Sequence, residues 1–187
     1  MTDLVKAPAT AATPVAARPG AGGGDTHQYL TFTLGGEMFA VGILNVKEII
    51  EYGNLTEIPM MPGFIRGVIN LRGAVVPVVD LAARFGGKTS EVQRRTCIVI
   101  VEVQQDDARH DIGIMVDAVS EVLEIGAKDI EPPPSFGAKV RADFIAGMGK
   151  VGGKFVIILQ IERVLSVDEM ALLADVSQAN PESIANN

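Results

Sequence analysis

The feature that most constrains the fold of this chain is an internal repeat. Residues 64–81 read FIRGVINLRGAVVPVVDL, and residues 144–161 match them without a gap as FIAGMGKVGGKFVIILQI. Five of these eighteen positions are identical, and most of the others are apolar in both copies. A second match joins residues 46–50 to residues 119–123. Because a repeated sequence predicts a repeated structural unit, we expect two similar halves. Positions at which the halves differ are then candidates for function.

Two differences between the copies bear on function. Arg72 and Asp80 of the first copy are replaced by Gly152 and Gln160 in the second. Arg72 lies at the predicted tip of a hairpin between two apolar strands. There it is either a solvated turn residue or an interaction residue that Glu48 or Asp80 positions. Arginine suits an interaction because its planar guanidinium makes directional hydrogen bonds to carboxylates and carbonyls. Local sequence leaves both interpretations open.

The composition limits the class of protein. Of the 187 residues, 48% are hydrophobic but only 5% are aromatic, so the core must consist of Val, Ile, Leu and Met. The net charge of −7 argues against binding to nucleic acid or to an anionic membrane surface. No apolar run approaches the roughly 20 residues of a membrane span, and no signal peptide is recognisable. The single Cys97 fits a reducing compartment. We therefore expect a soluble, cytoplasmic protein without direct membrane insertion.

Short apolar segments separated by glycine turns predict an all-β fold. Residues 1–27 are rich in Ala, Pro and Gly and predict a disordered tail. The predicted strands follow at residues 29–34, 38–43, 67–70, 74–81, 97–103, 112–116 and 155–161. Residues 44–50 fit either a short helical turn or a continued strand. Two small barrels of about five strands each accommodate this pattern and leave few exposed sheet edges.

The end of the chain carries a helix signal. Ser166 and Glu169 have the spacing of a capping box, which predicts a short helix over residues 168–175. Residues 176–187 are polar and are predicted to be flexible. Pro77 lacks a backbone N–H, so its strand position is predicted to be an edge or a bulge.

Motifs for catalysis or ligand binding are incomplete. Residues 87–89 read GKT, as at the end of a phosphate-binding loop, but Ala82 stands where the first glycine is required. His110 lies among aspartates, yet nothing supplies the remaining ligands of a metal site, and a solvated hairpin loop explains these residues. No nucleophile–base pair or paired-carboxylate motif is visible. We expect no cofactor, no metal and no enzymatic activity; a nucleotide-binding enzyme is the alternative from another class.

One apolar cluster indicates a partner surface. Residues 43, 46, 49 and 50 are all Ile or Val, which is more apolar surface than a small barrel can easily enclose. Exposed apolar patches of this kind usually mark sites of interaction.

Several motifs together resemble CheW, the bacterial chemotaxis coupling protein family. They are FAVGI at residues 39–43, the residues Val46, Glu48 and Ile49, the pattern P-x-F-I-x-G at residues 62–67, NLRGAVVPVVDL at residues 70–81, and GIMVDAV at residues 113–119. The resemblance spans about residues 28–173. It implies two five-stranded SH3-like barrels packed over a shared core, followed by a short C-terminal helix. The implied domain covers residues 28–175, with intertwined repeat units at about 28–88 and 95–165.

The resemblance also implies partners. A CheW-like adaptor couples methyl-accepting chemoreceptors to the histidine kinase CheA, whose regulatory domain shares the fold, and it can form rings with further CheW copies beneath the receptor array. The residues carried over to a receptor-facing groove are Ile43, Val46, Glu48, Ile49, Gly67, Asn70, Arg72, Gly113 and Val116. A CheV-like adaptor and the isolated regulatory domain of a kinase have the same fold. We expect a free-standing coupling protein, because the sequence contains neither a receiver nor a kinase domain.

Overall fold

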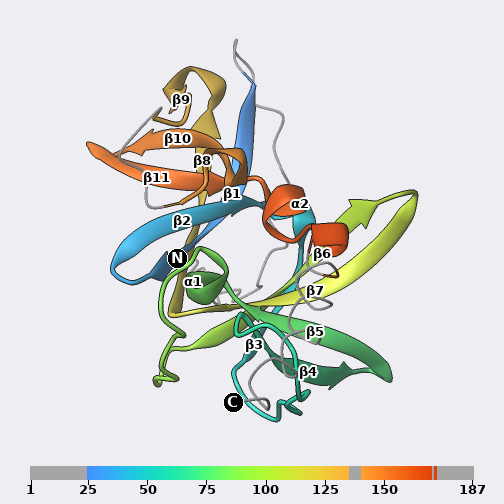
Figure 1. Ribbon diagram of the computed structural model, residues 1–187. Coiled ribbons are helices and arrows are strands. Elements are labelled where there is room, and N and C mark those ends of the chain that lie inside the picture. Colours follow the sequence, from blue (N-terminus) through green and yellow to red (C-terminus); the bar gives the residue numbers. More distant parts are fainter. Residues whose placement is uncertain (1–24, 135–139, 170, 172–187) are drawn as a thin grey trace, which may run out of the picture.

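The computed structural model describes residues 25–134, 140–169 and 171, which form two β-sheets (Figure 1). The first has the strand order β8 (Ala118–Gly126), β1 (Thr26–Leu34), β2 (Glu37–Gly42), β11 (Lys154–Leu159), β10 (Ile145–Val151) and β9 (Ile130–Glu131). The second has the order β3 (Val46–Glu51), β6 (Cys97–Gln105), β7 (Ala108–Val116), β5 (Ala74–Asp80) and β4 (Ile65–Leu71). Short helices connect them: the 3-10 turns η1 (Ile43–Asn45), η2 (Ala127–Asp129) and η3 (Ala142–Phe144), and the α-helices α1 (Leu81–Arg84) and α2 (Ile161–Val164). The predicted pair of SH3-like barrels is confirmed, although one sheet has six strands rather than five.

The two repeats exchange strands. After the β1–β2 hairpin the chain crosses to the other sheet, where β3 pairs with β6 of the second repeat. The second repeat does the reverse, because β8 leaves β6 and β7 and pairs with β1. The parallel pairs β2–β11 and β5–β7 complete the two sheets. Each barrel therefore contains strands from both repeats, and a repeat unit is not a barrel by itself.

Three apolar clusters hold the molecule together, one inside each barrel and a larger shared core between them. Strand β6 shows how one strand serves two of them. Ile98 and Ile100 point into their own barrel, whereas Val99, Val101 and Val103 point into the shared core. Because successive side chains of a strand face opposite sides, a strand buried on both faces has a continuous apolar sequence. The uninterrupted run at the start of β6 follows from this position.

A buried arginine joins the ends of the two repeats. The Nε–H of Arg84, in α1, donates to the carbonyl oxygen of Val164 in α2 at 2.9 Å, and its Nη2 donates to Oε1 of Glu169 at 3.0 Å. The guanidinium lies 4.8 Å from the ring centroid of Phe144 and 5.3 Å from that of Phe64, which are matching residues of the repeat. Val164 is the residue of the second repeat that matches Arg84 of the first. The contact between the two repeats is therefore asymmetric.

One predicted boundary differs from the structure, and one predicted helix is only partly described. Strand β1 begins at Thr26, two residues before the predicted boundary at Gln28, and the rest of the predicted tail lies outside the described residues, as does the segment 176–187. Ser166 is the helix cap that the sequence indicated, because its Oγ accepts from the N–H of Glu169 at 3.3 Å. The carboxylate of Glu169, which a capping box would return to Ser166, instead accepts hydrogen bonds from Arg84 and Arg141. Of the predicted helix over residues 168–175, only residues 168, 169 and 171 are described.

Candidate interaction surface

The hairpin between β4 and β5 presents Arg72 at its tip. Arg72 and Gly73 form a two-residue turn with φ values of +52° and +85°. Two consecutive left-handed residues match the twist of the flanking strands, and glycine adopts this conformation without strain. Asn70 stabilises the turn, because its Oδ1 accepts from the N–H of Gly73 at 2.9 Å. Asn70 thus has a local structural role in addition to its predicted place in the site.

Arg72 is held by Glu48 of β3. Its Nη1 and Nη2 donate to the two carboxylate oxygens of Glu48 at 2.9 and 3.0 Å, the two-pronged geometry that guanidinium and carboxylate favour. The Arg72 side chain is 78% exposed and that of Glu48 is 25% exposed. The pair therefore adds little to stability, but it fixes the direction of an outward-facing arginine. Asp80, the other predicted partner, is fully buried and accepts instead from Ser90 at 2.7 and 2.9 Å.

The apolar residues of the predicted groove adjoin Glu48 in the chain, in η1 and β3. Ile43 and Val46 are half-buried and pack against the shared core, whereas Ile49 is exposed. Residues 44–50, whose sequence fits either a helical turn or a strand, contain both. The 3-10 turn η1 ends at Asn45, and β3 begins at Val46. The same turn exposes 96% of Leu44, which the sequence did not single out. A fully exposed leucine in a turn has no local sequence signature.

Three predicted site residues are buried. Val116 lies in the shared core, and Gly113 lies between neighbouring strands, where a Cβ atom would be 2.7 Å from Cγ2 of Ile98. At Gly67 a Cβ atom would collide with the carbonyl oxygen of Thr56. These residues cannot present side chains to a partner. They position the strands and loops that do.

Ion pairs tie the neighbouring part of β3 to the β6–β7 hairpin. Lys47 Nζ lies 3.0 Å from Asp111 and 3.4 Å from Glu102, and Arg109 lies 3.5 Å from Glu102. The hydrogen bond that Lys47 donates to Asp111 is the main reason that the pKa of Lys47 is raised. Consecutive residues of β3 thus have different partners. Glu48 contacts the β4–β5 hairpin, and Lys47 contacts β7.

The motifs for other chemistry have structural explanations. No helix follows Lys88 in the described part of this segment; instead, the backbone N–H and the hydroxyl of Ser90 bind Asp80. Asp106 and Asp107 form the turn of the β6–β7 hairpin, as the solvated-loop interpretation predicted, whereas His110 lies in β7, pairs with Val103 and is half-buried. Within residues 25–134, 140–169 and 171, no group of three potential metal ligands is close enough to hold an ion. No helix in the described residues is long and apolar enough to span a membrane.

An exposed arginine whose direction is fixed by a carboxylate is a feature typical of interaction domains. Comparison with known proteins identifies the family: the model of the CheW-like domain matches residues 28–169. A chemotaxis protein CheW of Klebsiella aerogenes is 36% identical over 154 residues, which cover 82% of this chain and 90% of that protein. One of Rhizobium meliloti is 33% identical over 143 residues, covering 76% and 90%. The crystal structure of the scaffolding protein TtCheW from Thermoanaerobacter tengcongensis has a TM-score of 0.67 and 34% identity, covering 75% of this chain and 88% of that one. The chain belongs to the CheW family of chemotaxis scaffold and adaptor proteins.

Proposed function

We propose that this protein is a non-catalytic, cytoplasmic adaptor that couples methyl-accepting chemoreceptors to the histidine kinase CheA in membrane-associated receptor arrays. The observation that carries the proposal is the exposed Arg72–Glu48 pair, which lies within the motifs that match the family. Gly152 stands at the position of Arg72 in the second repeat, so building a barrel does not require this arginine.

The two kinds of partner use different surfaces in this proposal. The receptor tip contacts the face that carries Arg72, Glu48, Ile43, Val46 and Ile49. Apolar residues supply contact area there, and the arginine supplies direction, a combination found in protein interfaces. The regulatory domain of CheA, and further CheW copies in rings, contact a barrel end. Gly67, Gly113 and Val116 support the receptor face from within, and Asn70 stabilises the turn that carries Arg72.

The coupling itself is tested by reconstitution. Purified protein is added to receptor-bearing membranes and CheA, and autophosphorylation of the kinase is measured with and without a receptor ligand. We expect ligand control of phosphorylation only when the protein is present. Identical kinase regulation in its absence would refute the proposal.

Arg72→Glu tests the site. The substitution places two carboxylates where an ion pair stood, and it leaves the core untouched because Arg72 is exposed. We expect receptor binding in a pull-down to fall by about tenfold, as is typical for loss of a charged anchor. Arg163→Glu is the matched control, because Arg163 is exposed and forms no ion pair with any described residue. Retention of wild-type binding to both receptor and kinase by Arg72→Glu would exclude Arg72 from the interface.

A further inference from the structure

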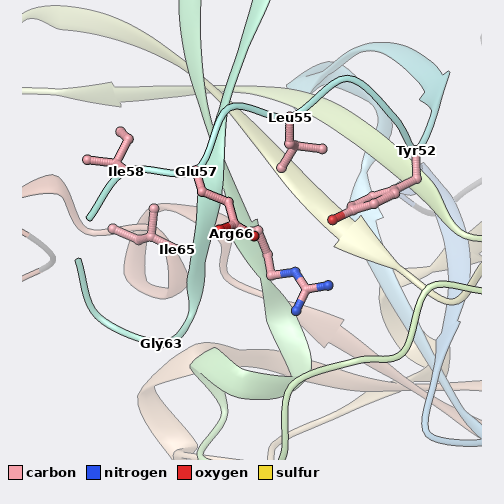
Figure 2. Close-up of a pocket in the computed structure, with 7 residues that line it drawn as sticks. All are labelled: Tyr52, Leu55, Glu57, Ile58, Gly63, Ile65 and Arg66. Atoms are coloured by element: carbon pink, nitrogen blue, oxygen red, sulfur yellow. The ribbon is translucent and has the colours of Figure 1, made fainter. Parts of the chain in front are cut away.

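A pocket of about 440 Å³ lies between the segment that follows β3 and the start of β4 (Figure 2). Its lining residues are Tyr52, Leu55, Glu57, Ile58, Gly63, Ile65 and Arg66. In Figure 2 the side chain of Arg66 extends from β4 into the pocket, and the hydroxyl end of Tyr52 points toward the same space. Aliphatic side chains stand around these two polar groups. The pocket thus combines directional hydrogen-bond donors with the carboxylate of Glu57 and with aliphatic side chains.

Local backbone geometry directs Arg66 into this pocket. The β4–β5 ladder shifts register between Ile65 and Gly67, so Arg66 is the extra residue of a β-bulge, and a bulge changes the direction of its side chain. Gly67 has φ +150° and lets the preceding loop approach closely. That loop is fixed by a reciprocal pair of 2.9 Å hydrogen bonds between the backbones of Thr56 and Val68. The pocket is therefore a built feature of the fold.

Within the described residues Arg66 forms no ion pair, although Glu57 lines the same pocket. Among the cationic side chains of residues 25–134, 140–169 and 171, those without an ion pair are exposed, with the single exception of Arg66, which is half-buried. A guanidinium that has lost part of its hydration without gaining an anion carries a desolvation cost that an anionic ligand would relieve. The second repeat has the same bulge with Ala146 at this position, so the bulge does not require an arginine.

We propose that this pocket binds one carboxylate, carried by an acidic side chain of a protein partner, with Arg66 as its anchor and Tyr52 as a second donor. Glu57 lines the pocket and opposes further negative charge, which favours a single carboxylate over a phosphate dianion. Leu55, Ile58 and Ile65 can contact the aliphatic stem of the bound residue. This inference rests on the proposed adaptor function and adds a partner chemistry to it.

The surroundings favour a protein as the source of the carboxylate. Ile58 is 39% exposed and Met60 is 56% exposed on the same loop. Exposed apolar residues around a half-buried charged anchor are typical of protein interfaces, in which a rim excludes water from a central arginine. A small metabolite would leave these side chains in solvent.

The test uses the full chain and two blocked tripeptides, acetyl-Leu-Glu-Ile-amide and acetyl-Leu-Gln-Ile-amide. Binding is followed by NMR at the Nε–H of Arg66 and the ring of Tyr52. We expect saturable shifts with the Glu peptide and at least about tenfold weaker binding of the Gln peptide, because a charge-assisted hydrogen bond is lost. Arg66→Ala should reduce affinity for the Glu peptide equally. Arg94→Ala, at an exposed arginine without an ion pair, should leave it unchanged.

Several outcomes would overturn the inference. They are the absence of saturable shifts, equal binding of both peptides, and undiminished binding by Arg66→Ala. N-acetylglutamate amide is the small-molecule arm, and an affinity equal to that of the Glu peptide would refute a protein source. Two substitutions at this position distinguish loss of binding from loss of fold. Arg66→Ala introduces the residue that the second repeat has at this position, and Arg66→Gln keeps the length of the side chain. Receptor–kinase coupling in wild type is measured in parallel: its presence without peptide binding refutes only the pocket, and its absence with peptide binding refutes only the adaptor function.

Discussion

Replacing Arg84 with alanine tests the contact between the repeats. The substitution removes a charge-assisted hydrogen bond to the carbonyl of Val164, worth about 1.5–3 kcal/mol. It removes the ion pair with Glu169, worth less than about 1 kcal/mol because that carboxylate is partly exposed and keeps Arg141. It also removes cation–π contacts with Phe64 and Phe144, worth about 0.5–1 kcal/mol each. These terms overlap, so we expect a loss of about 3–5 kcal/mol.

Urea unfolding followed by far-UV circular dichroism measures this loss. For a chain of this size the expected change corresponds to a fall in Tm of about 10 °C. Arg163→Ala is the control, because it removes an exposed arginine from α2 and should change the free energy of unfolding by less than about 0.5 kcal/mol. Arg84→Met should be milder than Arg84→Ala, since methionine fills part of the space without a desolvated charge. A loss below about 1 kcal/mol in Arg84→Ala would show that the barrels are held by the apolar core alone.

Two further predictions concern buried or paired carboxylates. Asp80→Ala leaves the N–H groups of Ser90 and Ala83 without their acceptor and should lower the free energy of unfolding by about 2–3 kcal/mol, whereas a urea midpoint equal to wild type would contradict this role. Burial raises the pKa of Glu169, but hydrogen bonds from Arg84 and Arg141 outweigh it and leave the pKa lowered. Because the pKa of this carboxyl is lower in the folded than in the unfolded state, the ionised carboxylate stabilises the folded protein above the unfolded pKa of about 4.3. This stabilisation is lost as the pH falls through the folded pKa. The stability difference between wild type and Glu169→Gln should therefore be full at pH 7 and shrink in acid; a difference independent of pH would exclude the linkage.

Part of the fold followed directly from local sequence because local backbone chemistry determines it. The hairpin at Arg72 and Gly73 needed a glycine and two strands with apolar residues, and both are visible in the sequence. Pro77 was predicted to occupy an edge or a bulge. Instead it pairs with Val68 in the antiparallel β4–β5 ladder of a strand that lies between β4 and β7, and only the parallel pairing with β7 leaves it out, because that pairing begins at Val78. In the second repeat the matching Ile157 has an N–H and is already paired with Phe39.

The exchange of strands could not be predicted in the same way. The sequence of β3 does not specify its neighbour, which is β6 of the other repeat rather than a strand of its own repeat. The choice depends on how the whole chain closes its shared core, which no window of sequence contains. Glu169 was also assigned to the wrong partner. Its local capping role competes with two arginines that are 28 and 85 residues away in the chain.

Differences between the repeats gain meaning when they are sorted by burial. Asp80 and Arg84, which face Gln160 and Val164 in the alignment of the copies, are buried and bind other parts of the same chain. Arg84 explains how two unequal repeats join, because it reaches Val164 and Glu169, whereas Asp80 fixes the segment that follows the first repeat at Ser90. Arg72 is exposed but engaged by Glu48, so a partner meets an arginine whose direction is already fixed. Arg66 is half-buried and has no such carboxylate within the described chain. Its guanidinium can therefore gain more from an incoming carboxylate than that of Arg72, which would have to share or exchange its existing anion.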